Sequence, residues 1–158
     1  MILYRYVWTD RDFDQVGWHD ATVHACAFRM GPEQWLGTLL LDIDYILEWV
    51  QPPAGETSFK FWVAPATLAF EAASALEGEL GIHSLPPSFN DLRRGPADRP
   101  EATEMGYEKW VLDGHDFDLT LLSRGFKQVF RRQPILSSTP MIGLEDRGGI
   151  SFTLEPPT

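Results

Sequence analysis

The chain has 158 residues, of which 44% are hydrophobic and 13% aromatic, and it carries a formal net charge of −10. This length fits a single domain spanning residues 1–158, and the hydrophobic content excludes an intrinsically disordered chain. The excess of acidic residues makes nucleic acid an unfavourable partner, because phosphate groups are bound mainly through Lys and Arg. The same charge either attracts a partner protein with a basic surface or serves solubility alone.

The sequence contains no signal for a membrane or for a disulfide bond. No stretch approaches the roughly 18 apolar residues that span a bilayer, and residues 1–6 do not form a signal peptide. Cys26 is the only cysteine, so no intrachain disulfide can form. We therefore expect a cytoplasmic protein that does not associate with membranes.

A strand is predicted over residues 39–49, where apolar and acidic side chains alternate. Read with a period of two, one face is apolar, and the other carries Asp42, Asp44 and Glu48 together with two aliphatic residues. Three interpretations of these carboxylates are open: a solvated surface, structural hydrogen bonding to a loop or to Arg side chains, and a binding or cation site. The pattern favours the solvated surface.

Further alternating runs bounded by Gly and Pro indicate about eight or nine strands in all. One such strand covers residues 22–30, with His24 on the same side as Cys26, whose thiol is expected to be packed and inert. Residues 66–80 are compatible with a helix or a strand, and we expect a strand at 67–72 followed by a loop. The predicted fold class is mainly β: an antiparallel sandwich or curved roll with little helix.

Turn signals predict how the strands of the C-terminal half pair. Two dipeptides have the composition of two-residue hairpin turns, namely Asp113-Gly114 and Arg124-Gly125. These turns would align Lys109, Asp118 and Arg131 across three strands on the outer face. The aromatic and aliphatic residues of the same strands would then share the core, and the chain would end in loop with a last strand at 150–154.

A catalytic or metal site would have to be assembled from His19, Asp20, Asp42 and Asp44. His and Asp are ligands for zinc or manganese, and carboxylates at i and i+2 of a strand are close enough to share an ion. The His residues lack a familiar zinc spacing, however, and no nucleophile elbow, phosphate loop or dinucleotide motif occurs. We therefore predict no catalytic residue, no metal and no cofactor.

Three segments together resemble a family of small uncharacterised bacterial proteins with the pattern HD…LDIDYI..W…APATL.FE. The segments are Gly17-Trp18-His19-Asp20, Leu41 to Ile46 with Trp49, and Val63 to Leu68 with Phe70-Glu71. The resemblance implies a strand at 67–72. In its acidity the chain is also similar in style to small immunity proteins of bacterial toxin systems.

The function predicted from the sequence is that of an intracellular binding or interaction protein, of the immunity type, that meets a basic partner surface. Trp49 joins the binding candidates because tryptophan is enriched at interfaces. The candidate binding residues are His19, Asp20, Asp42, Asp44, Glu48 and Trp49. The alternative function is a metal-dependent or carboxylate-using enzyme centred on His19, Asp20, Asp42 and Asp44, and the sequence does not indicate an oligomeric state.

Overall fold

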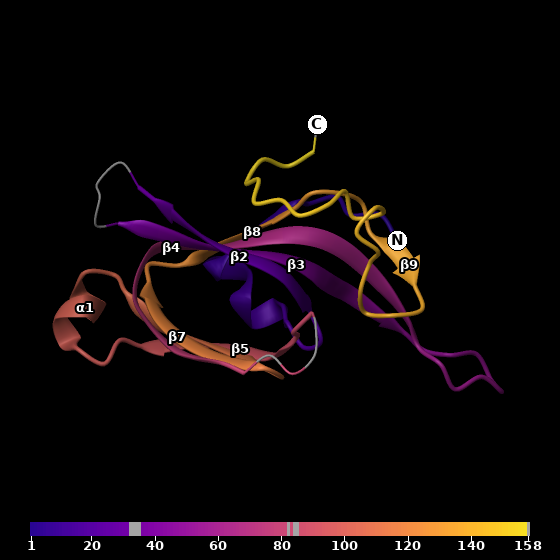
Figure 1. The fold of residues 1–158 in the computed structure, drawn as a ribbon, viewed down its shortest axis with the longest axis horizontal. Helices are drawn as coiled ribbons and strands as arrows, with labels where there is room; N and C mark the ends of the chain where they lie inside the picture. Colours follow the sequence, from indigo (N-terminus) through magenta and orange to yellow (C-terminus); the bar gives the residue numbers. More distant parts are fainter. Residues whose placement is uncertain (32–35, 82, 84–85, 158) are drawn as a thin grey trace.

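A computed structural model describes residues 1–31, 36–81, 83 and 86–157. Its strands form a nine-stranded antiparallel sheet that curls on itself, so the mainly β fold class and the curved roll are confirmed (Figure 1). The strands are β1 (Val7–Thr9), β2 (Thr22–Met30), β3 (Gly37–Val50), β4 (Lys60–Leu80), β5 (Phe89–Pro96), β6 (Glu108–Gly114), β7 (Phe117–Ser123), β8 (Phe126–Phe130) and β9 (Ile135–Ser137). The helical segments are the 3-10 helix η1 (Asp10–Gln15) and α1 (Pro100–Glu104). Within the described residues, no helix has the length and hydrophobicity required to cross a bilayer.

The long strand β4 joins the two halves of the curled sheet. Its first part pairs with β3 along one edge and with β8 and β9 along the other, while its last part pairs with β7. Between these parts the register shifts, and Ala72 and Ala75 have positive φ angles of 51° and 49°. The ladder is interrupted there, and such bulges bend a strand. The strand expected at 67–72 is therefore confirmed, whereas the loop expected after it is wrong.

The main hydrophobic core lies inside the curl. The first half of the sheet contains β2, β3, β8, β1 and the first part of β4, and the second contains β7, β6, β5 and the last part of β4. The apolar face predicted for residues 39–49 is confirmed, because Leu41 and Ile43 pack in one cluster with Trp110 and Phe130. In Figure 1 the segment containing η1 lies between the two halves.

The pairing expected from the two turn dipeptides is wrong. In the β6–β7 hairpin Asp113 lies opposite Asp118, and Lys109 lies opposite Leu122, because the turn is longer than two residues. Phe117 packs so closely over Gly114 that a Cβ on this glycine would lie 2.2 Å from the ring. Strand β8 does not fold back onto β7, since both lie end to end along β4. The predicted row of Lys109, Asp118 and Arg131 therefore does not form.

The C-terminal segment, residues 138–157, crosses the outer face of the first half of the sheet (Figure 1). It contains no assigned strand, so the strand expected at 150–154 is wrong, and β9 pairs with the start of β4 instead. Ile142 of this segment packs with Ile46 and Val63 in a second hydrophobic cluster. The face of β3 that carries the carboxylates is therefore covered by protein.

Candidate functional site

The carboxylates of Asp42 and Asp44 are fully buried, at 0% exposure, so the solvated surface expected for them is wrong. Arg147 reaches both of them from the C-terminal segment. Its Nη1 and Nη2 donate to the two oxygens of Asp42 at 2.8 and 2.7 Å, and its Nε donates to Oδ1 of Asp44 at 3.0 Å. Structural hydrogen bonding to a loop and to Arg side chains, one of the three interpretations of this face, is confirmed for these two residues.

The Arg147 guanidinium has an acceptor for each of its five N–H groups. The two that remain after the carboxylates donate to the carbonyl oxygens of Gly149, at 2.8 Å, and Ile43, at 3.4 Å. Gly149 follows Gly148, and both have positive φ angles near 80°, which glycine adopts without steric cost. This glycine pair lets the chain turn directly after Arg147 and present a carbonyl back to it.

A second arginine completes the charge balance of the buried cluster. Arg131, just after β8, donates from Nη1 to Oδ1 of Asp42 at 2.7 Å and to the Ser151 carbonyl at 3.0 Å. The Ser151 amide in turn donates to Oδ2 of Asp42 at 3.0 Å. Two carboxylates thus face two guanidinium groups, so the charges of Asp42 and Asp44 are balanced by arginines of the same chain. We call Asp42, Asp44, Arg131 and Arg147 the buried ion-pair cluster.

His24 joins this cluster because β2 contains a bulge. The β2–β3 register shifts between Val23, opposite Ile43, and Ala25, opposite Asp42. His24 therefore projects to the outer face, where Nε2 lies 2.8 Å from Oδ2 of Asp44. Cys26 lies opposite Leu41, on the inner face, so the expectation that His24 and Cys26 share a side is wrong.

The environment keeps the buried carboxylate of Asp44 ionised. Burial raises its pKa, but the hydrogen bonds from His24 and the Ile142 amide and the charge of Arg147 outweigh this and hold the pKa below its ordinary value. Burial likewise opposes the charged form of Arg147, yet its hydrogen bonds to Asp42 and the charges of Asp44 and Asp42 raise its pKa. The cluster is therefore a set of ion pairs that holds the C-terminal segment on the sheet, with Nη2 of Arg131 as its one nitrogen that lacks a hydrogen-bond partner among the described residues.

The geometry leaves little room for carboxylate chemistry at this place. The guanidinium of Arg147 lies between Asp42 and Asp44, where a cation shared by them would have to bind. In the described part of the chain, no three His, Cys, Asp or Glu side chains are grouped as metal ligands. His19 and Asp20 are not among the residues that contact the two buried carboxylates.

The other four candidate residues lie at the surface, where water reaches their side chains. The rings of His19 and Trp49 are 6.3 Å apart between centroids, and His19 Nδ1 lies 3.2 Å from Oδ2 of Asp20. Asp20 has a φ angle of 62° in the turn before β2, and Glu48 is exposed. The structure thus divides the six predicted residues into a buried pair and a surface group, which we call the His19–Trp49 surface.

Sequence reasoning missed an apolar groove on the inner face, between β2 and the last part of β4. Two cavities of about 220 and 110 Å³ follow one another along the same strands, with leucines from β3 and β7 as their floor. Phe28 and Met30 of β2 are 71% and 66% exposed, and Leu76 and Leu80 of β4 are 39% and 66% exposed. We call this surface the β2–β4 groove.

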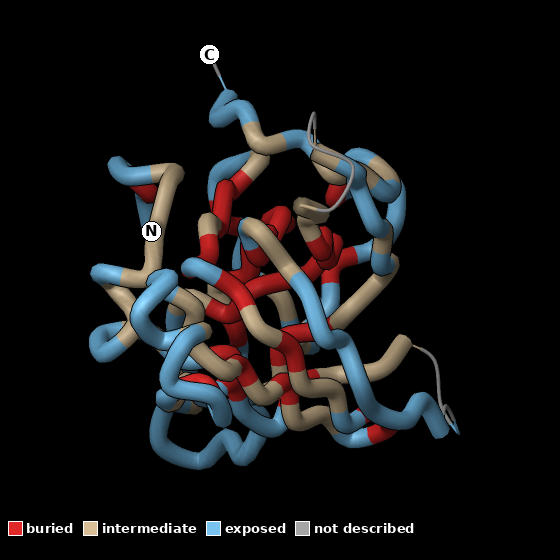
Figure 2. Tube along the Cα trace, turned by 90° about the vertical axis from the view of Figure 1, so that its left-hand side faces the viewer, coloured by how far each residue is buried: buried red, intermediate tan, exposed pale blue. Residues whose placement is uncertain are grey.

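Burial changes along β4 where the groove begins. The strand is buried up to Phe70 and exposed over its last residues. Figure 2 shows the buried segments gathered in the middle of the molecule and the exposed ones around them. Cys26 also lines the groove and is exposed, so the expectation of a packed thiol is wrong. Partial burial nevertheless raises the pKa of this thiol.

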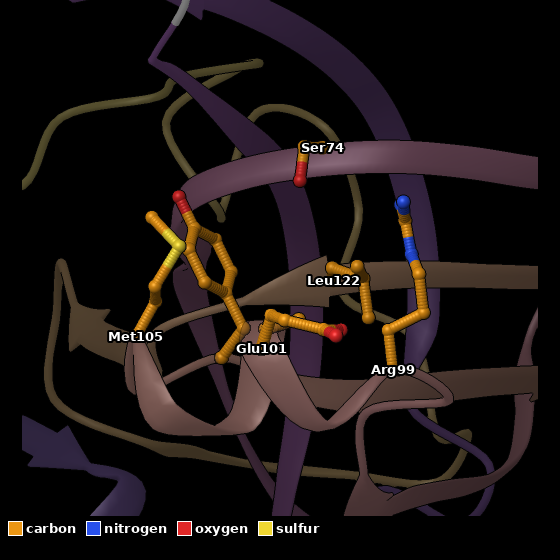
Figure 3. Close-up of a pocket in the computed structure, with 7 residues that line it drawn as sticks. Ser74, Arg99, Glu101, Met105 and Leu122 are labelled. Carbon is orange, nitrogen blue, oxygen red and sulfur yellow. The ribbon is translucent and has the colours of Figure 1, made fainter.

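A further cavity, of about 290 Å³, lies beside α1 (Figure 3). Ser74 of β4 and Leu122 of β7 form one side, and Glu101 of the helix forms the other, together with Arg99 just before the helix and Met105 just after it. Its two charged residues have opposite signs, so the cavity favours neither an anion nor a cation. It provides no chemical argument comparable to that of the groove.

Comparisons with protein-family models, with curated proteins and with solved structures give no match. The resemblance of the three N-terminal segments therefore remains a prediction.

Proposed function

We propose that the protein is a binding protein that receives a basic partner protein in the β2–β4 groove. The observation that carries this proposal is the exposure of four large apolar side chains, Phe28, Met30, Leu76 and Leu80, around adjoining apolar cavities. Contiguous exposed apolar surface in a concave setting is typical of interaction sites. Burying these side chains against a partner supplies the favourable free energy of binding.

Charge supports a basic partner. The chain has a net charge of −10, and the exposed acids Glu77, Glu79 and Asp118 lie on the strands that border the groove. Arg29 is the basic residue among those that line the two cavities. Two copies of this chain would repel one another, whereas a basic protein would be drawn to the groove. An acidic binding protein of the immunity type fits this description.

The proposal keeps the class of function predicted from the sequence but moves the binding surface. Asp42 and Asp44 are neutralised by Arg147 and Arg131 and covered by the C-terminal segment, so they have no free oxygen to offer a partner. The same engagement weakens the alternative of a carboxylate-using enzyme. The His19–Trp49 surface is the second place where a partner would bind, and the experiment must separate it from the groove.

Matched aspartate substitutions test the proposal. Leu80→Asp places a charge in the groove, and Ile2→Asp places one at a residue of similar exposure, 63% against 66%, outside it. We expect basic proteins captured from native lysate by the wild type to be kept by Ile2→Asp and lost by Leu80→Asp. Calorimetry with the purified partner should then show at least about a tenfold loss of affinity for Leu80→Asp.

Two results would contradict the proposal. The first is a set of captured proteins that Leu80→Asp retains with unchanged affinity. The second is loss of the same proteins on Trp49→Ala, which would locate the binding site on the His19–Trp49 surface instead. Thermal unfolding of each variant establishes that the comparison is made between folded proteins.

A further inference from the structure

We infer that the partner enters the β2–β4 groove as an extended strand that adds to the free edge of β2. This inference rests on the proposed function and specifies the form in which the partner is recognised. Strand addition combines backbone hydrogen bonds at a sheet edge with pockets for alternate side chains.

The outer edge of β2 has backbone groups free to pair. Apart from the bridge between Thr22 and Ser88 and the hydrogen bond from the Val23 amide to the Pro87 carbonyl, β2 pairs only with β3 among the described residues. The Gly31 amide donates to the Leu36 carbonyl, which makes these residues a hydrogen-bonded pair. Hydrogen-bonded and non-bonded pairs alternate in an antiparallel ladder. The amides and carbonyls of Met30, Phe28 and Cys26 therefore point away from β3, into the groove.

The last part of β4 presents a second edge to the same groove. The Gly81 amide donates to the Asp116 carbonyl of the neighbouring chain segment, which leads into β7. By the same alternation, the backbone groups of Leu80 and Gly78 point away from β7. No other strand pairs with this part of β4 within the described residues. A segment in the groove thus meets unpaired backbone on both of its sides.

Side chains define what such a segment must look like. Cys26 and Phe28 lie opposite Leu41 and Leu39, so they project to the inner, apolar face, where the cavities are. Every second residue of the added strand would enter these cavities and must be apolar. The intervening residues would lie on the outer face, where two acids of β4, Glu77 and Glu79, outnumber the one base of the β2 edge, Arg29, and so favour Lys or Arg. The recognised segment is therefore an extended run of alternating apolar and basic residues.

The probe for this inference is an acetylated, amidated peptide of about ten residues in which valine and lysine alternate. Two control peptides accompany it: one of the same composition with valines and lysines in separate blocks, and one methylated on the backbone nitrogens of its valines. We expect the alternating peptide to bind the full-length protein, and both controls to bind at least about fivefold more weakly. The block peptide controls for charge and the methylated peptide for backbone pairing.

The matched protein variants are Cys26→Pro and Cys26→Ala. Proline removes the amide at the free edge, which an edge strand tolerates when that amide faces solvent, while alanine keeps the amide and changes only a small side chain. Cys26→Ala is the reference, because it also removes the thiol that lines the groove but keeps the amide. Compared with Cys26→Ala, Cys26→Pro should bind the alternating peptide at least about fivefold more weakly, in line with loss of an interfacial hydrogen bond.

The outcomes separate this inference from the proposed function. If Leu80→Asp abolishes peptide binding but methylation and Cys26→Pro do not affect it, strand addition is wrong and the groove remains the binding site. If no peptide binds up to about millimolar concentration while the captured basic partners still depend on Leu80, strand addition of this type is also overturned. If β2 instead pairs with a second copy, seen as a Cys26-linked dimer and a doubled mass in solution, both proposals are wrong. Peptide methylation needs no variant, so a Cys26→Pro that fails to fold leaves the test intact.

Discussion

The two faces of the sheet at β2 and β3 reverse the usual relation between polarity and burial. On the outer face Asp42 and Asp44 are excluded from water, whereas on the inner face Phe28 and Met30 are exposed to it. The outer face is closed by a segment that brings its own arginine, Arg147. The inner face stays open at the groove, because the described chain supplies nothing to cover it. We therefore expect the charged face to stabilise the fold, and we propose the apolar face as the binding surface.

The outer face of β3, which we call the closed face, carries the buried carboxylates of Asp42 and Asp44 under the C-terminal segment. Burying an ionised carboxylate is unfavourable unless charge and hydrogen bonds compensate for the lost water. Here Arg147 satisfies both carboxylates at once and Arg131 adds a second guanidinium. Such a cluster forms only when the C-terminal segment lies in one register on β3. We therefore assign it the role of fixing that segment.

Removing Arg147 should have the largest effect on stability. Arg147→Met leaves Asp42 and Asp44 buried with too few donors, and breaking a buried pair typically costs about 3–5 kcal/mol in the free energy of unfolding. Urea denaturation measures this loss. The control is Arg132→Met, since Arg132 is exposed and, among the described residues, donates to the Asp146 carbonyl alone; it should change the free energy by less than about 1 kcal/mol. Equal effects of the two variants would refute the structural role.

The second largest effect should come from acid, which removes the contribution of the Asp44 charge to the free energy of unfolding. Because the pKa of Asp44 in the folded state lies below its ordinary value, its charge stabilises the fold above the unfolded pKa, about 3.9. That contribution is lost as the pH falls through the folded pKa. Unfolding free energies of the wild type and Asp44→Asn, compared from neutral to acid pH, should converge. Parallel pH profiles would show that Asp44 does not contribute in this way.

Substitutions of exposed residues in the β2–β4 groove should have little effect on the free energy of unfolding. Leu80→Asp should change the free energy of unfolding by less than about 1 kcal/mol, as surface substitutions usually do. Leu41→Ala, in the buried floor of the same groove, should cost about 2–5 kcal/mol. Urea denaturation again provides the comparison. A large loss for Leu80→Asp would mean that the groove belongs to the core and is not a binding surface.

The smallest effect concerns the reactivity of Cys26. The thiol is exposed but its pKa is raised by partial burial, so less of it is thiolate near neutral pH. Iodoacetamide should modify it completely, at a rate below that of a free cysteine peptide. The alternating valine–lysine peptide should slow the reaction further. An unchanged rate in saturating peptide would place the peptide elsewhere.

Alternation predicted which side chains of β3 share a face, but not what covers them. Arg147 is separated from Asp42 by 105 positions and lies in a turn without a periodic pattern. Two signals were present in the sequence. Leu40 and Ile46 share the face of Asp42 and Asp44, which is unusual for a solvated surface, and residues 124–158 contain five bases and three acids. Neither signal specifies the pairing, because contacts between distant segments depend on the whole fold.

The strand pairing in the C-terminal half was predictable in its faces but not in its register. The turns predict Lys109 opposite Asp118, whereas it lies opposite Leu122, and this shift by an even number of residues keeps the same side chains in the core. The bend of β4 could not be predicted from the sequence, because Ala72 and Ala75 are not residue types that favour positive φ. The groove could not be predicted either, since it follows from that bend.

The decisive measurement is amide hydrogen exchange followed by NMR, with the alternating valine–lysine peptide as the ligand. It distinguishes binding in the β2–β4 groove from binding at the His19–Trp49 surface. We predict that the peptide protects the amides of Cys26, Phe28 and Met30 from exchange and leaves those of Glu48 and Trp49 unchanged. Protection at Glu48 and Trp49, with none along β2, would contradict the account.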